Sequence, residues 1–209
     1  MLNALQFSQR FPAPLRAEKD AWRELAALWN MAPGDGEPCA ELQRQQLHCF
    51  RGPGSTLAQI RQLGRPGIVT LHDESGRPMY ALLTGLGTQA ATLRMGSASQ
   101  TVSLTTLAQL WQGDFATLWR APAGYQNRIV DGSSGPAVDR LATQLAVLRG
   151  EAPPVVSQAY NERLRAAVRA FQRAQGLTAD GVAGPTTFMQ LNRATGVEEP
   201  RLQIDPIAD

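Results

Sequence analysis

The last third of the chain carries apolar residues at a regular helical spacing. Between residues 160 and 176 they recur at steps of three and four, and arginines occupy positions between them. The apolar positions are Leu164, Ala167, Val168, Phe171 and Ala174. This pattern predicts an amphipathic helix that packs one face against the rest of the protein. Gly176 follows the last of these positions and predicts a left-handed helix cap there.

Turn signals separate this helix from the next one. Asp180-Gly181 favours a turn with positive φ, and Gly184-Pro185 places a proline at the first position of a new helix, where no amide proton is needed. Upstream, apolar residues at positions 138, 141, 145 and 148 predict another helix that ends at Gly150. The segment 131–196 is therefore predicted to form a small domain of three packed helices.

Residues 17–121 have a different pattern, with helical periodicity first and alternation afterwards. Helices are predicted at 21–30, at 39–46 and, with Ser55 as the cap, at 57–63. Apolar or alternating runs bounded by turns predict strands at 47–50, 67–72, 79–85, 90–94, 100–102 and 114–120, with a short helix at 104–111. This order predicts an α+β domain with an antiparallel sheet.

Length and linkers divide the chain further. A chain of 209 residues exceeds the usual size of one domain. We expect an N-terminal arm (1–16), the α+β domain (17–121), a connector (122–130), the three-helix domain (131–196) and a C-terminal tail (197–209).

Charge and hydropathy narrow the range of partners. The net charge is +2, and the arginines lie on helix faces instead of in a basic run interleaved with aromatic residues, so nucleic acid is not expected as a partner. No run of about eighteen apolar residues occurs, and the residues after Met1 lack the pattern of a secretory signal. We expect no membrane contact by this segment. If the protein works outside the cytoplasm, its export signal or anchor lies beyond this chain.

Two cysteines, Cys39 and Cys49, lie in a predicted helix and in the strand that follows it. A strand that folds back along the helix would bring their sulfurs within bonding distance. A disulfide closing a loop of this size would stabilise the fold by about 3 kcal/mol at most, and it would persist only in an oxidising compartment. Two buried free thiols are the alternative.

The sequence gives little support for metal-dependent, phosphate-binding or hydrolytic chemistry. His48 and His72 have no cysteine or carboxylate partners at ligand spacing, so we expect neither a metal site nor a cofactor. The chain has no Walker-type phosphate loop and no nucleophile elbow. Asp73, Glu74 and Asp114 are the candidate carboxylates for glycoside hydrolysis, but their positions are typical of solvated turn residues.

The order F-Q-x3-G-L-x2-D-G-x2-G-P-x-T-x3-L, which begins at Phe171, resembles the peptidoglycan-binding domain of cell-wall hydrolases. The resemblance implies a three-helix fold that binds a glycan or stem-peptide polymer without chemistry of its own. It implies a turn-lined groove whose candidate residues are Gln172, Arg173, Asp180, Gly181, Gly184, Pro185 and Thr187. Asp180 and Thr187 also have a structural explanation, because such residues cap turns and helices.

The order of elements in residues 17–121 resembles the papain-like C39 peptidase domain. A working cysteine peptidase needs a thiolate at a helix N-terminus, an imidazole beside it and a group that orients the imidazole. The resemblance places the cysteine near 17–21, the histidine at about Met79 and the orienting aspartate near Met95, and these positions hold other residue types. We therefore expect a peptidase-like domain without catalytic residues.

An inactive C39-like domain followed by a peptidoglycan-binding domain resembles the periplasmic region of the general secretory pathway protein A (ExeA) family. Family members carry an ATPase domain and one membrane span before this region, so the resemblance implies the periplasmic region of an inner-membrane protein. It implies attachment to peptidoglycan and, with a small inner-membrane partner protein, help to the type II secretion secretin as it assembles across the wall. The secretin itself and a second copy of this chain are further candidate partners.

Two other function classes stay open. One is a cysteine peptidase or amidase directed to the cell wall, in which Cys39 or Cys49 would act beside His48 or His72. The other is a protein-interaction module whose wall-binding groove has decayed, because the glycine and apolar positions of the motif are needed to build the fold in any case.

Overall fold

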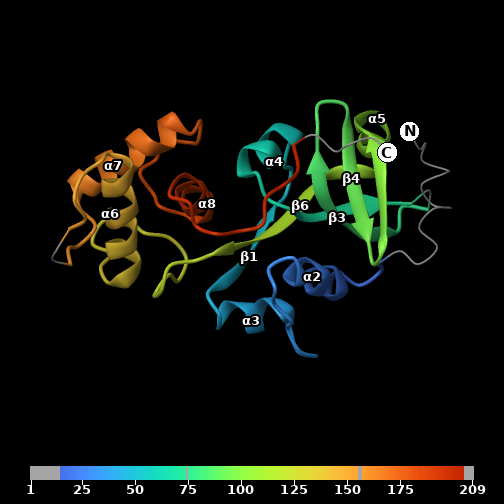
Figure 1. Cartoon of the computed structure of the whole chain (residues 1–209), viewed down its shortest axis with the longest axis horizontal. Coiled ribbons are helices and arrows are strands. Elements are labelled where there is room, and N and C mark those ends of the chain that lie inside the picture. The colour runs from blue at the N-terminus through green and yellow to red at the C-terminus, as the bar shows by residue number, and fades with distance from the viewer. Residues whose placement is uncertain (1–14, 74, 155–156, 205–209) are drawn as a thin grey trace. The chain divides into compact units, whose positions relative to one another are not determined.

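The computed structural model describes residues 15–73, 75–154 and 157–204 (Figure 1). The predicted N-terminal arm (1–16) and the end of the predicted tail (197–209) lie largely outside the described residues. The internal contacts divide the chain into two compact units. Unit 1 is Met1–Leu118 together with Pro200–Asp209, and unit 2 is Trp119–Glu199.

Unit 1 contains a six-stranded sheet in the order β1-β6-β2-β3-β4-β5. Its strands are β1 (Leu47–Gly52), β2 (Gly67–His72), β3 (Pro78–Leu86), β4 (Ala90–Met95), β5 (Ala98–Ser103) and β6 (Trp111–Arg120), and its helices are α2 (Glu18–Ala27), α3 (Pro38–Gln43), α4 (Leu57–Leu63) and α5 (Leu104–Leu110). From β2 to β5 the strands form an antiparallel meander, and β6 pairs antiparallel with β2. Each predicted strand overlaps an observed one, and the α+β class is confirmed.

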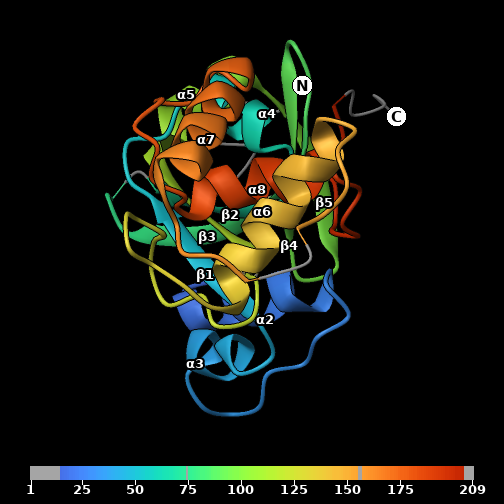
Figure 2. The same ribbon diagram turned by 90° about the vertical axis from the view of Figure 1, so that its left-hand side faces the viewer.

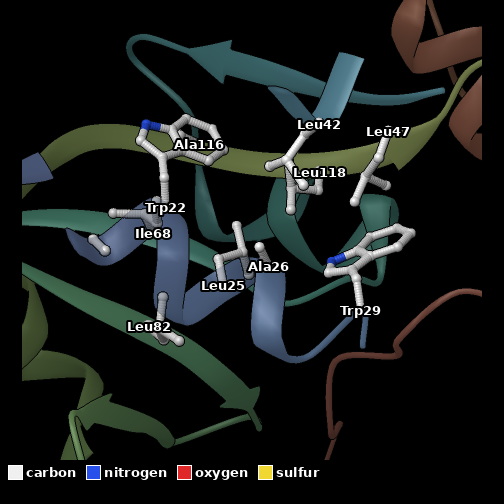
Figure 3. Close-up of a cluster of buried hydrophobic side chains, with 11 residues drawn as sticks. Trp22, Leu25, Ala26, Trp29, Leu42, Leu47, Ile68, Leu82, Ala116 and Leu118 are labelled. Carbon is white, nitrogen blue, oxygen red and sulfur yellow. The ribbon is translucent and has the colours of Figure 1, made fainter. Parts of the chain in front are cut away.

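A cluster of buried apolar side chains joins α2 and α3 to this sheet (Figure 3). Trp22 and Leu25 of α2 share the cluster with Leu42 of α3, Ile68 of β2 and Leu82 of β3. None of these side chains is more than 2% exposed. Burial of one large apolar side chain contributes about 2 kcal/mol, so the cluster fixes both helices on the sheet.

The cap of α4 differs from the prediction by one residue. Thr56 Oγ1 accepts a hydrogen bond from the Gln59 N–H at 3.2 Å, and Gln59 Oε1 accepts one from the Thr56 N–H at 2.8 Å. The predicted cap, Ser55, instead donates its hydroxyl to the carbonyl oxygen of Gly52 at 2.6 Å. Either residue type caps helices, and Thr56 is favoured because its partner Gln59 completes a reciprocal capping box.

The two cysteines form a disulfide that joins α3 to β1. Their Cα atoms lie 5.7 Å apart, because β1 packs back against α3. The prediction of a disulfide is thus confirmed, and the alternative of two free thiols is wrong. The loop that the bond closes is short, so its contribution to stability is about 3 kcal/mol at most.

Backbone hydrogen bonds attach the C-terminal tail to unit 1. The Leu202 N–H donates to the carbonyl oxygen of Gly64 at 3.0 Å, and the Gln203 N–H donates to that of Thr84 at 3.0 Å. The Leu86 N–H donates to the carbonyl oxygen of Gln203 at 2.7 Å. With the Leu202 side chain only 5% exposed, the tail forms part of the unit 1 core. The chain therefore returns to unit 1 after it has built unit 2.

Unit 2 contains α6 (Pro136–Leu148), α7 (Glu162–Ala174) and α8 (Pro185–Ala194), with α6 packed against both other helices (Figure 2). All three helices end in a Schellman motif, in which a left-handed glycine is followed by a residue whose N–H donates five residues back. The glycines are Gly150, Gly176 and Gly196, and the donor–acceptor pairs are Glu151–Ala146 (2.9 Å), Leu177–Gln172 (2.8 Å) and Val197–Asn192 (2.9 Å). The predicted helix ends at Gly150 and Gly176 are confirmed.

An aromatic group lies at the centre of unit 2. The ring centroids of Trp119 and Tyr125 are 5.1 Å apart, and that of Phe188 lies 6.0 Å from Trp119 and 5.4 Å from Tyr125. Edge-to-face and offset arrangements of this kind add to the stabilisation that burial provides. The predicted apolar stripes are too long, however. Leu148 is 39% exposed and Ala174 is exposed, because these final residues of α6 and α7 extend beyond the buried core.

Within the described ranges, every helix is too short or too polar to cross a lipid bilayer.

The tail yields a stability prediction. A chain that stops after Glu199 should lose about 2–4 kcal/mol of unfolding free energy, because the Leu202 side chain and the backbone partners of Gly64 and Thr84 are removed. A chain that stops after Ile204 keeps the Leu202 and Gln203 contacts and is the matched reference for this loss. Urea denaturation followed by circular dichroism measures both, and equal midpoints for all three chains would show that the tail does not support unit 1.

Candidate functional site

The turn motif is built around one buried side chain, that of Gln172, which is 2% exposed. Its Nε2 donates to Asp180 Oδ1 at 3.0 Å and to the carbonyl oxygen of Val182 at 3.1 Å. Thr187 Oγ1 lies 3.1 Å from the same nitrogen, and the Gly181 N–H donates to Gln172 Oε1 at 2.9 Å. An amide nitrogen carries two hydrogens, which these three acceptors share. Gln172 therefore ties the end of α7 to the loop and to the start of α8.

The turn itself requires glycine at position 181. Gly181 has a φ of +76°, and a Cβ there would lie 2.6 Å from Arg165 Cγ and 3.1 Å from Arg169 Nε. Asp180 Oδ1 accepts a hydrogen bond from the Val182 N–H at 2.8 Å, which closes the turn. The predicted positive-φ turn is thus present, and its close approach to α7 is a second reason for glycine.

A second buried side chain, Tyr160, holds the loop from the other side. Its hydroxyl donates to the carbonyl oxygen of Gly181. An antiparallel bridge between Ile129 and Ala183 adds a hydrogen bond of 3.1 Å in each direction. Burial, with a smaller contribution from Asp131, raises the pKa of Tyr160 to about 12. Sequence reasoning missed Tyr160, because it precedes α7 and has no place in the helical spacing.

The seven predicted groove residues do lie around this one loop, but they differ in exposure. The buried ones are Gln172, Gly181 and Thr187, the half-buried ones are Gly184 and Pro185, and the exposed ones are Arg173 and Asp180. Gly184 and Pro185 form the start of α8, as the sequence predicted. The buried members shape the loop, so a ligand on this side would reach chiefly the exposed pair.

Sequence reasoning did not identify a pocket of about 660 Å³ between α6 and α7. Its polar lining comes from Arg149, Glu151, Ser157, Gln158 and Arg163. The Arg149 guanidinium donates to both carboxylate oxygens of Glu151 at 2.8 Å. This pairing, with a smaller contribution from Arg163, holds the pKa of Glu151 below its ordinary value. Each of these residues by itself is typical of a solvated helix end, so no local signal marked them.

Unit 1 holds apolar residues at two of the positions that the C39 resemblance gives to a catalytic triad. Met79 and Met95 are each 3% exposed. The Tyr80 N–H donates to the carbonyl oxygen of Leu15 at 2.9 Å, so the chain just before α2 lies beside β3. In the first turn of α2, Glu18 accepts a hydrogen bond from Trp22 Nε1 at 3.2 Å. A carboxylate thus stands near the position where the resemblance would put a thiol.

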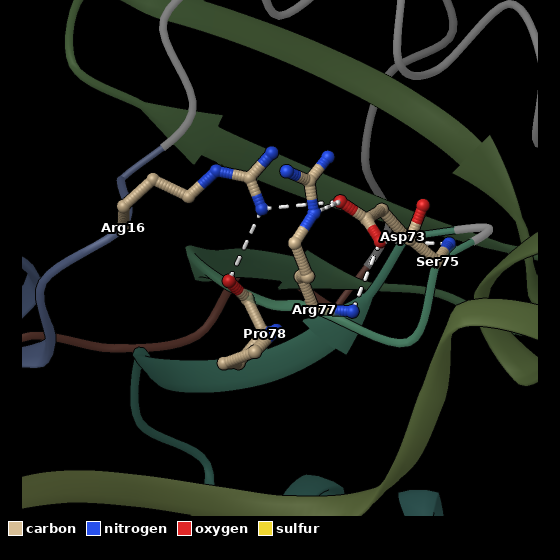
Figure 4. Close-up of polar contacts among 5 residues, drawn as sticks. All are labelled: Arg16, Asp73, Ser75, Arg77 and Pro78. Carbon is tan, nitrogen blue, oxygen red and sulfur yellow. Dashed lines mark hydrogen bonds and ion pairs between the residues drawn. The ribbon is translucent and has the colours of Figure 1, made fainter.

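The carboxylate of Asp73 is occupied by the turn between β2 and β3 (Figure 4). Its Oδ1 accepts from the N–H groups of Ser75 and Arg77 at 2.9 and 3.0 Å, and its Oδ2 pairs with Arg77 Nε at 3.2 Å and Arg16 Nη1 at 3.3 Å. The Arg77 N–H contributes most to lowering the pKa of Asp73. Such a carboxylate stays ionised and does not suit a general acid. Glu74, the neighbouring candidate, lies outside the described residues.

The histidines form no metal site with their surroundings. Among the residues that the structure describes, no group of three or more His, Cys, Asp or Glu side chains is arranged to hold a metal ion. Burial lowers the pKa of His48. Because Cys39 and Cys49 are bonded to each other, neither offers a thiolate to His48 or His72.

Residues 134–191, which contain α6, α7 and most of α8, match the peptidoglycan binding domain family. The chain is also 33% identical over 165 residues to general secretion pathway protein A of Aeromonas hydrophila, over 79% of this chain and 30% of that protein. The similarity to general secretion pathway protein A thus extends over most of this chain. The resemblance that the sequence predicted is thereby confirmed.

The fold of this chain has a counterpart among solved structures. The periplasmic domain of the EpsAB fusion protein of the Vibrio vulnificus type II secretion system matches with a TM-score of 0.59 and 24% identity, over 91% of this chain and 82% of that one. Zinc D-Ala-D-Ala carboxypeptidase of Streptomyces albus G is 33% identical over 118 residues, 55% of this chain and 44% of that protein. The chain spans less than half the length of these two curated relatives.

The hydrogen bonds of Gln172 give a stability prediction for this chain. Gln172→Leu should lower the unfolding free energy by about 2–3 kcal/mol, because the Gly181 N–H loses its partner and Asp180 and Val182 lose a donor. Arg173→Leu, one position along α7 and exposed, is the control and should change it by less than about 0.5 kcal/mol. Urea denaturation compares them, and similar values for both variants would contradict the role given to Gln172.

The raised pKa of Tyr160 predicts a loss of stability at alkaline pH. The fold favours the neutral phenol, so its stabilisation is complete below the ordinary pKa of about 10 and is lost as pH rises towards about 12, by at most about 2–3 kcal/mol. Tyr160→Phe cannot ionise, so the stability gap between parent and variant should narrow from pH 8 to pH 11. Urea denaturation at each pH measures the gap, and a constant gap would refute this assignment.

Proposed function

We propose that this chain is a non-catalytic, periplasmic, peptidoglycan-binding region of a type II secretion assembly factor, which helps the secretin assemble across the cell wall. The observation that carries the proposal is the match of residues 134–191 to the peptidoglycan binding domain family. It is supported by the three-helix unit that these residues build and by the similarity of the chain to general secretion pathway protein A.

The proposal of a non-enzymatic role draws on unit 1. Its peptidase-like order of helices and strands would need a free cysteine for catalysis. The chain has two cysteines, and they are joined in the Cys39–Cys49 disulfide. Buried methionines at positions 79 and 95 also favour a role in contact and not in cleavage. The alternative of a cysteine peptidase or amidase is therefore disfavoured.

The periplasmic location is supported by the same disulfide, because such bonds persist in oxidising compartments and are rare in the cytosol. The relationship to general secretion pathway protein A supports it further. Within that setting we propose a small inner-membrane partner protein, the secretin and further copies of this chain as protein partners of unit 1.

The remaining alternative is an interaction module whose wall binding has been lost. One observation supports this alternative. Gln172, Gly181 and Thr187 are buried and hold the loop together. The fold would need these residues with or without a ligand, so their presence does not separate the two functions.

Sedimentation with purified, insoluble peptidoglycan tests the proposal. The whole chain should pellet with peptidoglycan and stay in the supernatant with cellulose, and an excess of soluble muropeptides should release it. The whole chain is required, because a truncation within unit 2 also removes the tail that pairs with unit 1. Recovery of the chain in the supernatant with both polymers would favour the interaction module.

A further inference from the structure

Helix α7 has two separate surfaces in unit 2. The loop between α7 and α8 (residues 175–184, the motif loop) covers only one of them. Gly181 lies against Arg165 and Arg169, whereas Arg163 and Ala167 line the pocket between α6 and α7. At about 100° per residue, these two pairs lie on opposite sides of the helix. The pocket is therefore a site distinct from the predicted turn-lined groove.

The polar groups of the motif loop are already satisfied within the fold. Gln172 uses both ends of its amide, and Gly181 uses both its N–H and its carbonyl oxygen. A ligand on that side would have to displace these bonds or rely on exposed side chains alone. The pocket, in contrast, offers charged groups that face an unfilled volume.

We infer that the pocket between α6 and α7 binds the peptide part of peptidoglycan, with the Arg163 guanidinium on a free carboxylate of the peptide. This inference rests on the proposed function and assigns its site and its ligand. It differs from the turn-lined groove in every residue.

Arg163 is the group that selects a carboxylate. In the described part of the chain it makes no hydrogen bond or ion pair, and its charge acts on Glu151 only at a distance. A guanidinium binds a carboxylate through two parallel N–H···O bonds, which are among the strongest hydrogen bonds in proteins. Arg149 does not compete for the ligand, because Glu151 already occupies it.

Glu151 and the floor of the pocket add to the selection. Each Glu151 oxygen keeps a lone pair after its bond to Arg149, so the carboxylate can accept from an amine of the ligand. The floor is formed by Ala142, Ala146 and Ala167, whose small side chains leave room for methyl groups. The described lining has no aromatic ring on which a sugar could stack. The peptides of peptidoglycan carry alanine methyl groups, free carboxylates and, where they are not cross-linked, a free amine.

Two polar groups of the pocket, Glu151 and Ser157, are held in place before a ligand arrives. The Schellman motif at Gly150 sets the position of Glu151 directly after α6. At the far end of the lining, the Ser157 hydroxyl donates to Asp139 Oδ2 at 2.7 Å, which fastens this residue to α6. Binding groups that are held in place lose little conformational entropy on association. A volume of about 660 Å³ is within the range of small-ligand sites.

Titration of the whole chain with the free stem tetrapeptide, L-alanyl-γ-D-glutamyl-meso-diaminopimelyl-D-alanine, tests the site. Arg163→Gln should weaken binding about tenfold or more, because a charge-assisted pair is lost. Arg140→Gln makes the same change at an exposed position of α6 outside the pocket lining and should weaken it less than about twofold. Arg163→Lys keeps the positive charge but cannot form two parallel N–H···O bonds. Its affinity should therefore lie between those of the parent and Arg163→Gln. Calorimetry gives each affinity, and thermal unfolding checks that each variant is folded.

The outcomes separate this inference from the proposed function. If Arg163→Gln binds the tetrapeptide as tightly as the parent and Arg140→Gln do, the pocket is not the site. If the chain pellets with peptidoglycan but binds no tetrapeptide, or pellets equally with glycan strands stripped of their peptides, the ligand is the glycan and the inference is overturned while wall binding stands. If the chain does not pellet at all, the proposed function itself fails.

Discussion

The buried amide of Gln172 is the contact on which unit 2 depends. It reaches Asp180 and Thr187, eight and fifteen residues further along the chain, and so joins the end of α7, the loop and the start of α8. A buried polar side chain is costly unless its hydrogen bonds are made, and here the loop backbone supplies two of the partners. Satisfying the Gln172 amide fixes the conformation of the loop. The left-handed turn at Gly181 and the position of Tyr160 follow from that conformation.

This constraint changes how the family motif relates to function. Residues that define a wall-binding motif are easily taken for ligand contacts. Gln172, Gly181 and Thr187, however, lie inside the fold. Their hydrogen bonds are made within the fold, and the opposite side of α7 forms a charged pocket with α6. The part of the motif that is easiest to recognise thus builds the scaffold, while less distinctive residues such as Arg163 face solvent.

Unit 1 shows a related separation between fold and chemistry. Its sheet and the α2–α3 cluster need apolar side chains at fixed places, and a disulfide and a returning tail complete them. None of these features requires a catalytic group. Met79 and Met95 occupy, as buried core residues, the positions that the C39 resemblance gives to a histidine and an aspartate. The fold of unit 1 therefore forms without a histidine or an aspartate at these two positions.

The sequence by itself determined the features that arise within a few residues. Gly150, Gly176 and Pro185 mark helix ends because left-handed caps and first-turn prolines depend only on local dihedral angles and on hydrogen bonds within five residues. Strand alternation and the α+β order were predictable for the same reason. Only the tertiary structure decided that Thr56 caps α4, that Leu148 is exposed, that Leu202 returns to unit 1, and that Arg163 and Glu151 meet at one pocket. These outcomes depend on which distant segments pack together, and residue spacing along the chain carries no record of that.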